Sequence, residues 1–196
     1  MTEPIGSPVA YWLGRFWMWL FGWQVKGHVP AGGKFVLVGA PHTSNWDFPF
    51  TLAAAAVLRL RISWLGKDSA FKGPLGPIMR GLGGIPIDRS SPQGLVSQIA
   101  ARFDQSDQLI IAIAPSGTRR QTQYWKSGFY WIAHAAQVPI LCGYLDYRRK
   151  RAGVGLSFVP TGDIGADMDR IREFYQDFQG KKPELATRVR LADEDA

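Results

Sequence analysis

Short apolar runs alternate along the chain with longer segments whose apolar residues recur at helical spacing. The apolar runs are typical of buried strands, and they cover residues 34–40, 61–66, 85–87, 109–114, 139–145 and 154–160. The helical spacing, or a run of alanines, covers residues 47–60, 74–82, 92–103, 128–137 and 167–178. Because strands and helices alternate, the pattern predicts an α/β layered fold in which helices flank a central, largely parallel sheet.

The segment before the first strand has a different composition. Residues 9–25 contain four of the eight tryptophans, and Arg15 is their only charge. The segment is shorter than the roughly 20 residues that cross a bilayer. Tryptophan and tyrosine prefer the headgroup boundary of a membrane, so the composition favours a helix that lies in one leaflet. Packing against the protein's own core and spanning the bilayer are the alternatives, and the lack of a broad polar face counts against the interfacial interpretation.

These patterns divide the chain into three parts. Residues 1–23 form an aromatic, membrane-associated segment, residues 24–180 form one folded domain, and residues 181–196 form a tail that we expect to be frayed. Cys142, the single cysteine, lies in an apolar strand and has no partner for a disulfide, which fits a reducing compartment. The first residues lack the basic region of a secretory signal, so we expect the protein at the cytoplasmic face of a membrane, peripheral or monotopic.

The net charge of +7 is unevenly distributed. Residues 1–160 carry 17 basic and 7 acidic side chains, whereas residues 161–196 carry 6 and 9. The basic part needs an anionic partner, and nucleic acid is not expected because no RNP, zinc-finger or helix-turn-helix signature occurs. An anionic membrane surface and a phosphate-bearing donor remain. The basic run Arg148–Arg151 could contact lipid headgroups, or it could be a solvated turn between two strands.

Candidate chemistry begins where the first predicted strand ends. His42 and Asp47 bracket the sequence His-Thr-Ser-Asn-Trp-Asp. Five residues of continuous helix would separate their side chains by about 140° around the axis, so a pair requires that His42 lie in the turn. A histidine oriented by a carboxylate can remove a proton from a hydroxyl without a serine nucleophile, which predicts hydroxyl acylation. The alternative is structural, because Ser44-x-x-Asp47 is also a capping box at a helix start.

Two further segments place anion-binding groups after predicted strands. Gly83–Arg89 ends in an aspartate and an arginine, and Pro115–Arg120 contains Gly117, Thr118 and Arg119. Glycine lets backbone N–H groups approach an oxyanion, threonine adds a hydroxyl, and arginine offers a planar fork that matches phosphate. Arg89, Gly117, Thr118 and Arg119 are therefore the predicted substrate-binding residues.

On these motifs the sequence resembles the phospholipid and glycerol-phosphate acyltransferases typified by 1-acylglycerol-3-phosphate acyltransferase. The family's blocks occur in order: His-x4-Asp matches His42 and Asp47, a glycine-rich run matches Gly84–Arg89, Pro-Glu-Gly-Thr-Arg matches Pro115–Arg119, and a Val-Pro-Ile-like strand start matches Val138–Ile140. The resemblance covers roughly residues 23–160. It implies that residues 24–180 are an acyltransferase domain with His42 as general base and Asp47 as its partner.

One position departs from the family pattern. Ser116 stands where the family usually carries the glutamate of its third block. The resemblance implies that this glutamate helps to shape the acceptor's headgroup site, so its loss leaves the acceptor open. Ser116 as a nucleophile is disfavoured, because the glycine before it in a nucleophile elbow is missing.

The residues and the resemblance together predict an enzyme that moves a fatty acyl group from acyl-CoA or acyl carrier protein to the free hydroxyl of a lysophospholipid. Acylation of another lipid or glycolipid hydroxyl, and a non-catalytic basic membrane-binding protein, are the alternatives. No cofactor is expected, since a thioester reacts without one. No metal site is expected either, because three scattered histidines and one cysteine offer no ligand spacing.

Overall fold

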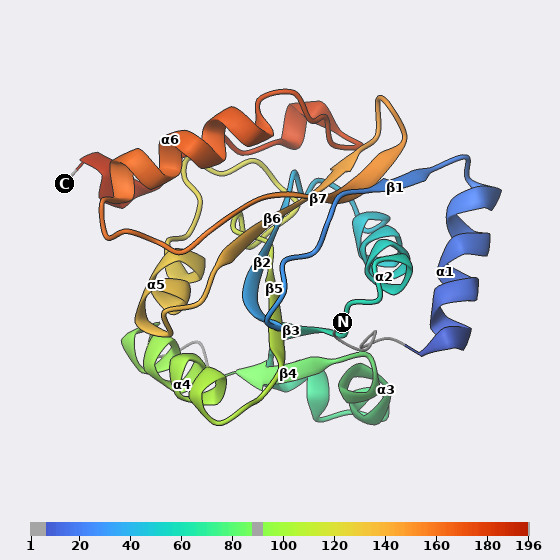
Figure 1. The fold of residues 1–196 in the computed structure, drawn as a ribbon, viewed down its shortest axis with the longest axis horizontal. Helices are drawn as coiled ribbons and strands as arrows, with labels where there is room; N and C mark the ends of the chain where they lie inside the picture. The colour runs from blue at the N-terminus through green and yellow to red at the C-terminus, as the bar shows by residue number, and fades with distance from the viewer. Residues whose placement is uncertain (1–6, 88–91, 196) are drawn as a thin grey trace.

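The computed structural model describes residues 7–87 and 92–195, and they form one seven-stranded sheet with helices on both faces (Figure 1). The strand order is β1-β7-β6-β2-β5-β3-β4, and every neighbouring pair is parallel except the β6–β7 hairpin. The strands are β1 Gln24–Lys26, β2 Lys34–Ala40, β3 Ile62–Lys67, β4 Gly84–Ile87, β5 Leu109–Ile113, β6 Ile140–Asp146 and β7 Arg151–Phe158. The predicted largely parallel sheet is thus confirmed.

The helices also follow the predicted order. They are α1 Pro8–Leu20, α2 Asp47–Val57, α3 Gly76–Gly81, α4 Pro92–Asp104, α5 Gly128–Ala135 and α6 Ile164–Tyr175, with short 3-10 turns at Asp68–Phe71, Pro183–Leu185 and Ala192–Asp195. Three predicted elements have boundaries that are wrong by three residues. Strand β7 begins at Arg151 instead of residue 154, α6 covers residues 164–175 instead of 167–178, and α2 ends at Val57 instead of residue 60. Arg148, Arg149 and Lys150 form the turn between β6 and β7, as the alternative interpretation of the basic run predicts.

The two faces of the sheet have different covers. Helix α2 packs on one face, where Ala55 meets Phe35, Leu37 and Leu141. Helices α4, α5 and α6 cover the other face with a larger cluster built around Val36, Ile111, Phe129, Ile140 and Met168. Alternate residues of β2 point to opposite faces, which is why Leu37 and Val36 belong to different clusters. The alternation explains why an almost wholly apolar strand is required at this central position.

Helix α1 lies outside α2 and packs against it (Figure 1). A Cβ atom added at Gly14 would come within 2.7 Å of the Ala53 carbonyl oxygen, so a glycine allows this close approach. Met18 and Trp23 are buried with Phe50 in a third apolar cluster. One side of the aromatic segment therefore belongs to the core, as one of the sequence-based alternatives predicts.

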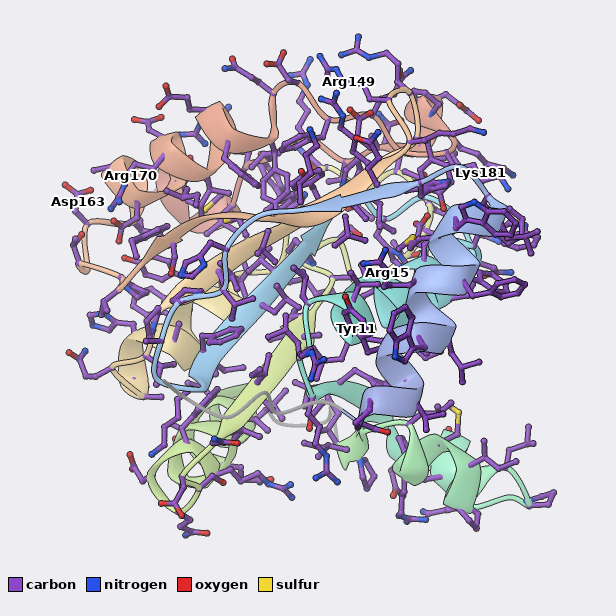
Figure 2. The ribbon with its side chains drawn as sticks, turned by 45° about the vertical axis from the view of Figure 1, so that its right-hand side comes forward. Tyr11, Arg15, Arg149, Asp163, Arg170 and Lys181 are labelled. Atoms are coloured by element: carbon purple, nitrogen blue, oxygen red, sulfur yellow. The ribbon has the colours of Figure 1, made fainter. Side chains whose placement is uncertain are left out.

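The outer side of α1 remains exposed and apolar. Trp12, Leu13, Phe16 and Trp19 are between 58% and 73% exposed. Tyr11 and Arg15 lie on the side turned toward the body of the protein (Figure 2), where the Arg15 guanidinium donates to the Tyr11 hydroxyl at 3.2 Å. Within residues 7–87 and 92–195, none of the helices has both the length and the apolar character needed to cross a membrane.

The prediction that the chain frays from residue 181 is wrong for the described residues. Leu191 is completely buried in the main core cluster and forms a bridge to Trp125. The Trp125 N–H donates to the Arg190 carbonyl at 2.8 Å, and Glu194 accepts from the Leu191 N–H and from Arg172. The acidic composition of this segment suggested fraying, but Leu191, the partly buried Val189 and the backbone pairing with Trp125 attach it to the core.

Candidate active site

The candidate residues converge at the carboxyl ends of parallel strands. His42 follows β2 and Gly117 follows β5, and β2 and β5 are neighbours in the sheet. Ligands of open α/β sheets bind at this edge, because loops from adjacent strands meet there. The structure therefore brings together the first and third predicted motifs. Arg89 and the end of the second motif lie outside the described residues.

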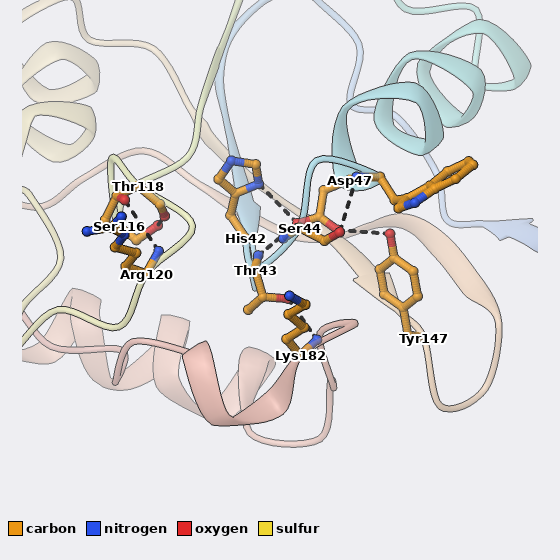
Figure 3. Close-up of polar contacts among 10 residues, drawn as sticks. His42, Thr43, Ser44, Asp47, Ser116, Thr118, Arg120, Tyr147 and Lys182 are labelled. Carbon is orange, nitrogen blue, oxygen red and sulfur yellow. Dashed lines mark hydrogen bonds and ion pairs between the residues drawn. The ribbon is translucent and has the colours of Figure 1, made fainter.

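His42 and Asp47 form a direct pair (Figure 3). The His42 Nδ1 atom lies 3.1 Å from the Asp47 Oδ2 atom, and the side chains are 24% and 3% exposed. His42 lies in the turn before α2, as the spacing requires, and Asp47 is the first residue of the helix. Since Nδ1 faces the carboxylate, Nε2 is the ring nitrogen left to exchange a proton with a ligand.

The Asp47 carboxylate collects several donors. Oδ2 also accepts the N–H groups of Thr43 at 2.8 Å and Ser44 at 2.9 Å. Burial by itself raises the pKa of Asp47, but hydrogen bonds from His42, the Ser44 N–H, Tyr147 and the Thr43 N–H together lower it below its ordinary value. Asp47 is consequently ionised at neutral pH and can stabilise a positive imidazolium.

The expected capping box is not formed, because α2 begins at Asp47 after Trp46, and Trp46 makes no side-chain capping bond. The Ser44 hydroxyl accepts from the Trp46 N–H at 3.2 Å, and the Ser44 N–H donates to Asp47 as it would in such a box. The Asp47 carboxylate thus holds the turn before α2 and orients His42. The segment after α6 also stabilises this turn, since the Thr43 hydroxyl accepts from the Lys182 backbone N–H at 3.1 Å.

Tyr147 is a fifth member of this network that the sequence analysis missed. Its hydroxyl donates to Asp47 Oδ1 at 2.8 Å across a separation of 100 residues (Figure 3). Tyr147 follows β6, which pairs with β2 in parallel, so it lies at the same edge of the sheet as His42. The rule that located the other candidates, a polar residue just after a predicted strand, also applies to Tyr147.

The turn after β5 presents the third motif. Gly117 has a φ of 66°, and a Cβ atom there would come within 3.1 Å of the Lys126 side chain, so glycine fits this position for two reasons. The Ser116 hydroxyl donates to the Thr118 carbonyl at 2.8 Å, and the Thr118 hydroxyl accepts from the Arg120 N–H at 3.3 Å (Figure 3). Ser116 is 7% exposed, and its hydroxyl bond stabilises the turn in which it lies, which argues against a nucleophilic role.

An apolar cavity of about 620 Å³ opens between these two turns. His42, Asp47, Gly117 and Arg119 line it, together with Lys126. Its walls continue between α2 and the sheet along apolar residues, which include Leu37, Leu52, Ala55, Leu58, Leu60, Ile62, Ala112 and Val154. The cavity therefore has charged groups at the strand ends and an apolar interior. Among the described residues, no group of three His, Cys, Asp or Glu side chains could hold a metal ion.

Comparisons with known proteins identify the family and the fold of the chain. The profile of the family described as acyltransferase matches residues 23–145, which is more than half of the chain. The fold is similar to the crystal structure of the 1-acyl-sn-glycerophosphate (LPA) acyltransferase PlsC from Thermotoga maritima, with a TM-score of 0.56 and 16% sequence identity. That match covers 86% of this chain and 74% of the other, and at this identity it shows the fold alone. A comparison with curated protein sequences finds no significant match.

Proposed function

Because the chain belongs to the acyltransferase family and is an acyl-transferring enzyme, we propose that it moves a fatty acyl group from a thioester to the free hydroxyl of a lysophospholipid such as 1-acylglycerol-3-phosphate. The observation that carries the proposal is the His42–Asp47 pair at the mouth of the apolar cavity. Acyl-CoA and acyl carrier protein are both suitable donors, since each presents an acyl thioester.

In the proposed reaction, His42 Nε2 removes the proton of the acceptor hydroxyl while that oxygen attacks the thioester carbonyl carbon. The carbonyl becomes a tetrahedral oxyanion, and its collapse breaks the carbon–sulfur bond. The imidazolium then returns the proton to the departing thiolate, so the products are an ester and a free thiol. Asp47 stabilises the imidazolium and fixes its orientation, which in comparable triads is worth about 10⁴-fold in kcat.

The acceptor's phosphate is proposed to bind at the turn after β5. Arg119 lines the same cavity as His42, and the left-handed Gly117 lets backbone N–H groups approach an anion. Thr118 adds a hydroxyl to the same turn, and Arg89 is the remaining proposed phosphate contact from the sequence. An arginine fork matches phosphate oxygens, and one such charge-assisted bond contributes about 1.5–3 kcal/mol.

Ser116 supports a second candidate acceptor. Ser116 stands in place of the family's glutamate, and its hydroxyl donates to the Thr118 carbonyl. Position 116 therefore presents no negative charge to a headgroup. A headgroup that the glutamate would contact through its own hydroxyl or amine loses that partner. A lysolipid or glycolipid other than 1-acylglycerol-3-phosphate is therefore the alternative acceptor.

The membrane surface is the proposed location of the enzyme. The outer face of α1 carries the exposed apolar side chains, and α3, which lies near the amino-terminal end of α1 in Figures 1 and 2, adds Leu75 at its start and Ile78. Lys150 at the opposite end of α1 donates to the Phe21 carbonyl at 3.3 Å, and Lys181 lies 4.8 Å from the Trp46 ring. Apolar and cationic groups on one side suit the boundary of an anionic bilayer.

A thiol-release assay with one acyl thioester and a panel of lysolipid acceptors tests the proposal. We expect acceptor-dependent release of thiol by the wild-type protein and loss of at least 1000-fold of it in His42→Ala, by analogy with removal of a triad base. His134→Ala is the matched control, because His134 lies on α5 and does not line the cavity. His42→Ala activity within tenfold of wild type would exclude His42 as the base, and no release with any acceptor would contradict the proposed function itself.

A further inference from the structure

We propose that Tyr147 is a positioning residue for the His42–Asp47 pair: its hydroxyl fixes the second oxygen of the carboxylate and thereby sets how strongly His42 holds its proton. The role in turnover rests on the proposed function, whereas the effect on His42 can be measured without it. The proposal starts from how the two oxygens of Asp47 are used. Oδ2 receives His42 and two backbone N–H groups, and Oδ1 receives Tyr147 at 2.8 Å.

The Asp47 side chain is 3% exposed, so water cannot readily replace a lost partner at Oδ1. A carboxylate held at both oxygens cannot rotate about its last bond without breaking a hydrogen bond. Removing the Tyr147 hydroxyl would loosen this restraint at Oδ1, while the Thr43 and Ser44 N–H groups would still hold Oδ2 toward His42 Nδ1. The removal would also leave more of the negative charge for His42 to neutralise.

The position of Tyr147 is itself fixed on three sides. Its backbone N–H donates to the Gln179 carbonyl at 2.9 Å. Its ring packs edge-on against Trp23, with ring centroids 4.8 Å apart, and meets Phe50 of α2 at 6.0 Å. Trp23 in turn stacks on Phe50 at 4.4 Å. Tyr147 is thus held by three other parts of the chain, which suits a side chain whose hydroxyl orients a neighbour.

The other polar groups around Asp47 do not duplicate this contact. From the turn before α2 come His42 and the Thr43 and Ser44 N–H groups, all on Oδ2. The cations of the β6–β7 turn point elsewhere: Arg149 pairs with Asp146 at 3.0 Å, and Arg148 and Arg149 both donate to the Asp177 carbonyl. Tyr147 is therefore the group whose removal changes Asp47 at Oδ1.

Tyr147→Phe in the full-length protein tests the proposal, because it removes the hydroxyl and keeps the ring between Trp23 and Phe50. The matched control is Tyr130→Phe. The Tyr130 hydroxyl also donates to a buried carboxylate, Asp167 at 3.0 Å, between α5 and α6. Each variant loses one tyrosine–carboxylate bond, but only Tyr147 touches the candidate pair.

The first measurement is an NMR titration of ¹⁵N-labelled histidine without substrate. The chain has three histidines, and His42→Ala assigns the signal of His42. In Tyr147→Phe we expect the His42 midpoint to rise, because a carboxylate that loses a donor binds the imidazolium more strongly. The His28 and His134 midpoints should not move, and Tyr130→Phe should leave the His42 midpoint unchanged.

The second measurement is the pH dependence of acyl transfer. In Tyr147→Phe, kcat at neutral pH should fall about tenfold, as expected for loss of a hydrogen bond to a charged group, with KM changed less than twofold. The acidic limb of the profile should move to higher pH along with the His42 midpoint. Tyr130→Phe should lower Tm but leave kcat and the pH of the acidic limb unchanged.

An unchanged His42 midpoint in Tyr147→Phe would overturn the proposal, as would loss of activity in both variants in proportion to Tm. The titration needs no acyl donor or acceptor. A protein that transfers no acyl group would therefore contradict the proposed function and leave the result for Tyr147 intact.

Discussion

Gly39→Val tests whether the apolar cavity holds the acyl chain. Gly39 lies on β2 on the same face as Leu37, lines the cavity, and has no atom within 4 Å of an added Cβ. Valine adds three carbons, so it should displace about three methylenes of a bound chain. At about 0.8 kcal/mol for each buried methylene, the loss is about 2.4 kcal/mol, or roughly 50-fold in kcat/KM for a chain that fills the cavity.

The assay compares kcat/KM for a series of acyl thioesters with one acceptor. We expect the full loss for long chains, little change for chains that end before Gly39, and an intermediate loss in Gly39→Ala. Gly81→Val is the matched control, because a Cβ at Gly81 also meets nothing within 4 Å but lies outside the cavity. An equal loss for every chain length, with Tm unchanged, would refute the assignment of the acyl chain to this cavity.

Four further substitutions have defined outcomes. Asp47→Asn should lower kcat by about 100-fold or more. Because folding lowers the pKa of Asp47 from 3.8, the ionised carboxylate contributes fully to the free energy of unfolding above that pH, and this contribution is lost as the pH falls through the folded-state pKa. In urea unfolding, Asp47→Asn should therefore be less stable than wild type at pH 6, and the difference should shrink near pH 3. Arg119→Ala and Arg89→Ala should each raise KM for a phosphorylated acceptor about tenfold or more and leave KM for the thioester nearly unchanged. If initial-rate kinetics show the reverse pattern, the arginines bind the donor. Phe16→Glu should reduce sedimentation with anionic vesicles without lowering Tm. Val159 is also exposed, and Val159→Glu should leave sedimentation unchanged. Equal binding of both variants to the vesicles would contradict a membrane contact through α1.

The strands were predictable because a central parallel strand needs apolar residues on both faces. Residues 34–40 satisfy that requirement, and β2 has the predicted bounds. Strand β1, Gln24–Lys26, was missed because it is three residues long and lies at the sheet edge, where two of its side chains are exposed. Without a buried face, such a strand leaves no periodicity in the sequence.

The contacts around Asp47 were predictable only where the residues are close in sequence. His42 and Asp47 are five residues apart, so turn and helix geometry alone relates them. Tyr147 reaches Asp47 through the pairing of β6 with β2, and Lys182 reaches Thr43 after the chain has passed over α6. Those contacts depend on the strand order, which local patterns do not determine.

The aromatic segment shows why one sequence pattern left two interpretations open. A helix that is apolar on every side must be buried on every side or lie between two apolar phases. In α1, Gly14 and Met18 meet α2, and the opposite side exposes Trp12, Phe16 and Trp19. The missing polar face counted against an interfacial helix on the assumption that the other face would meet water. For a helix placed between the protein core and a lipid surface no polar face is required, so the composition of α1 supports the proposed membrane contact.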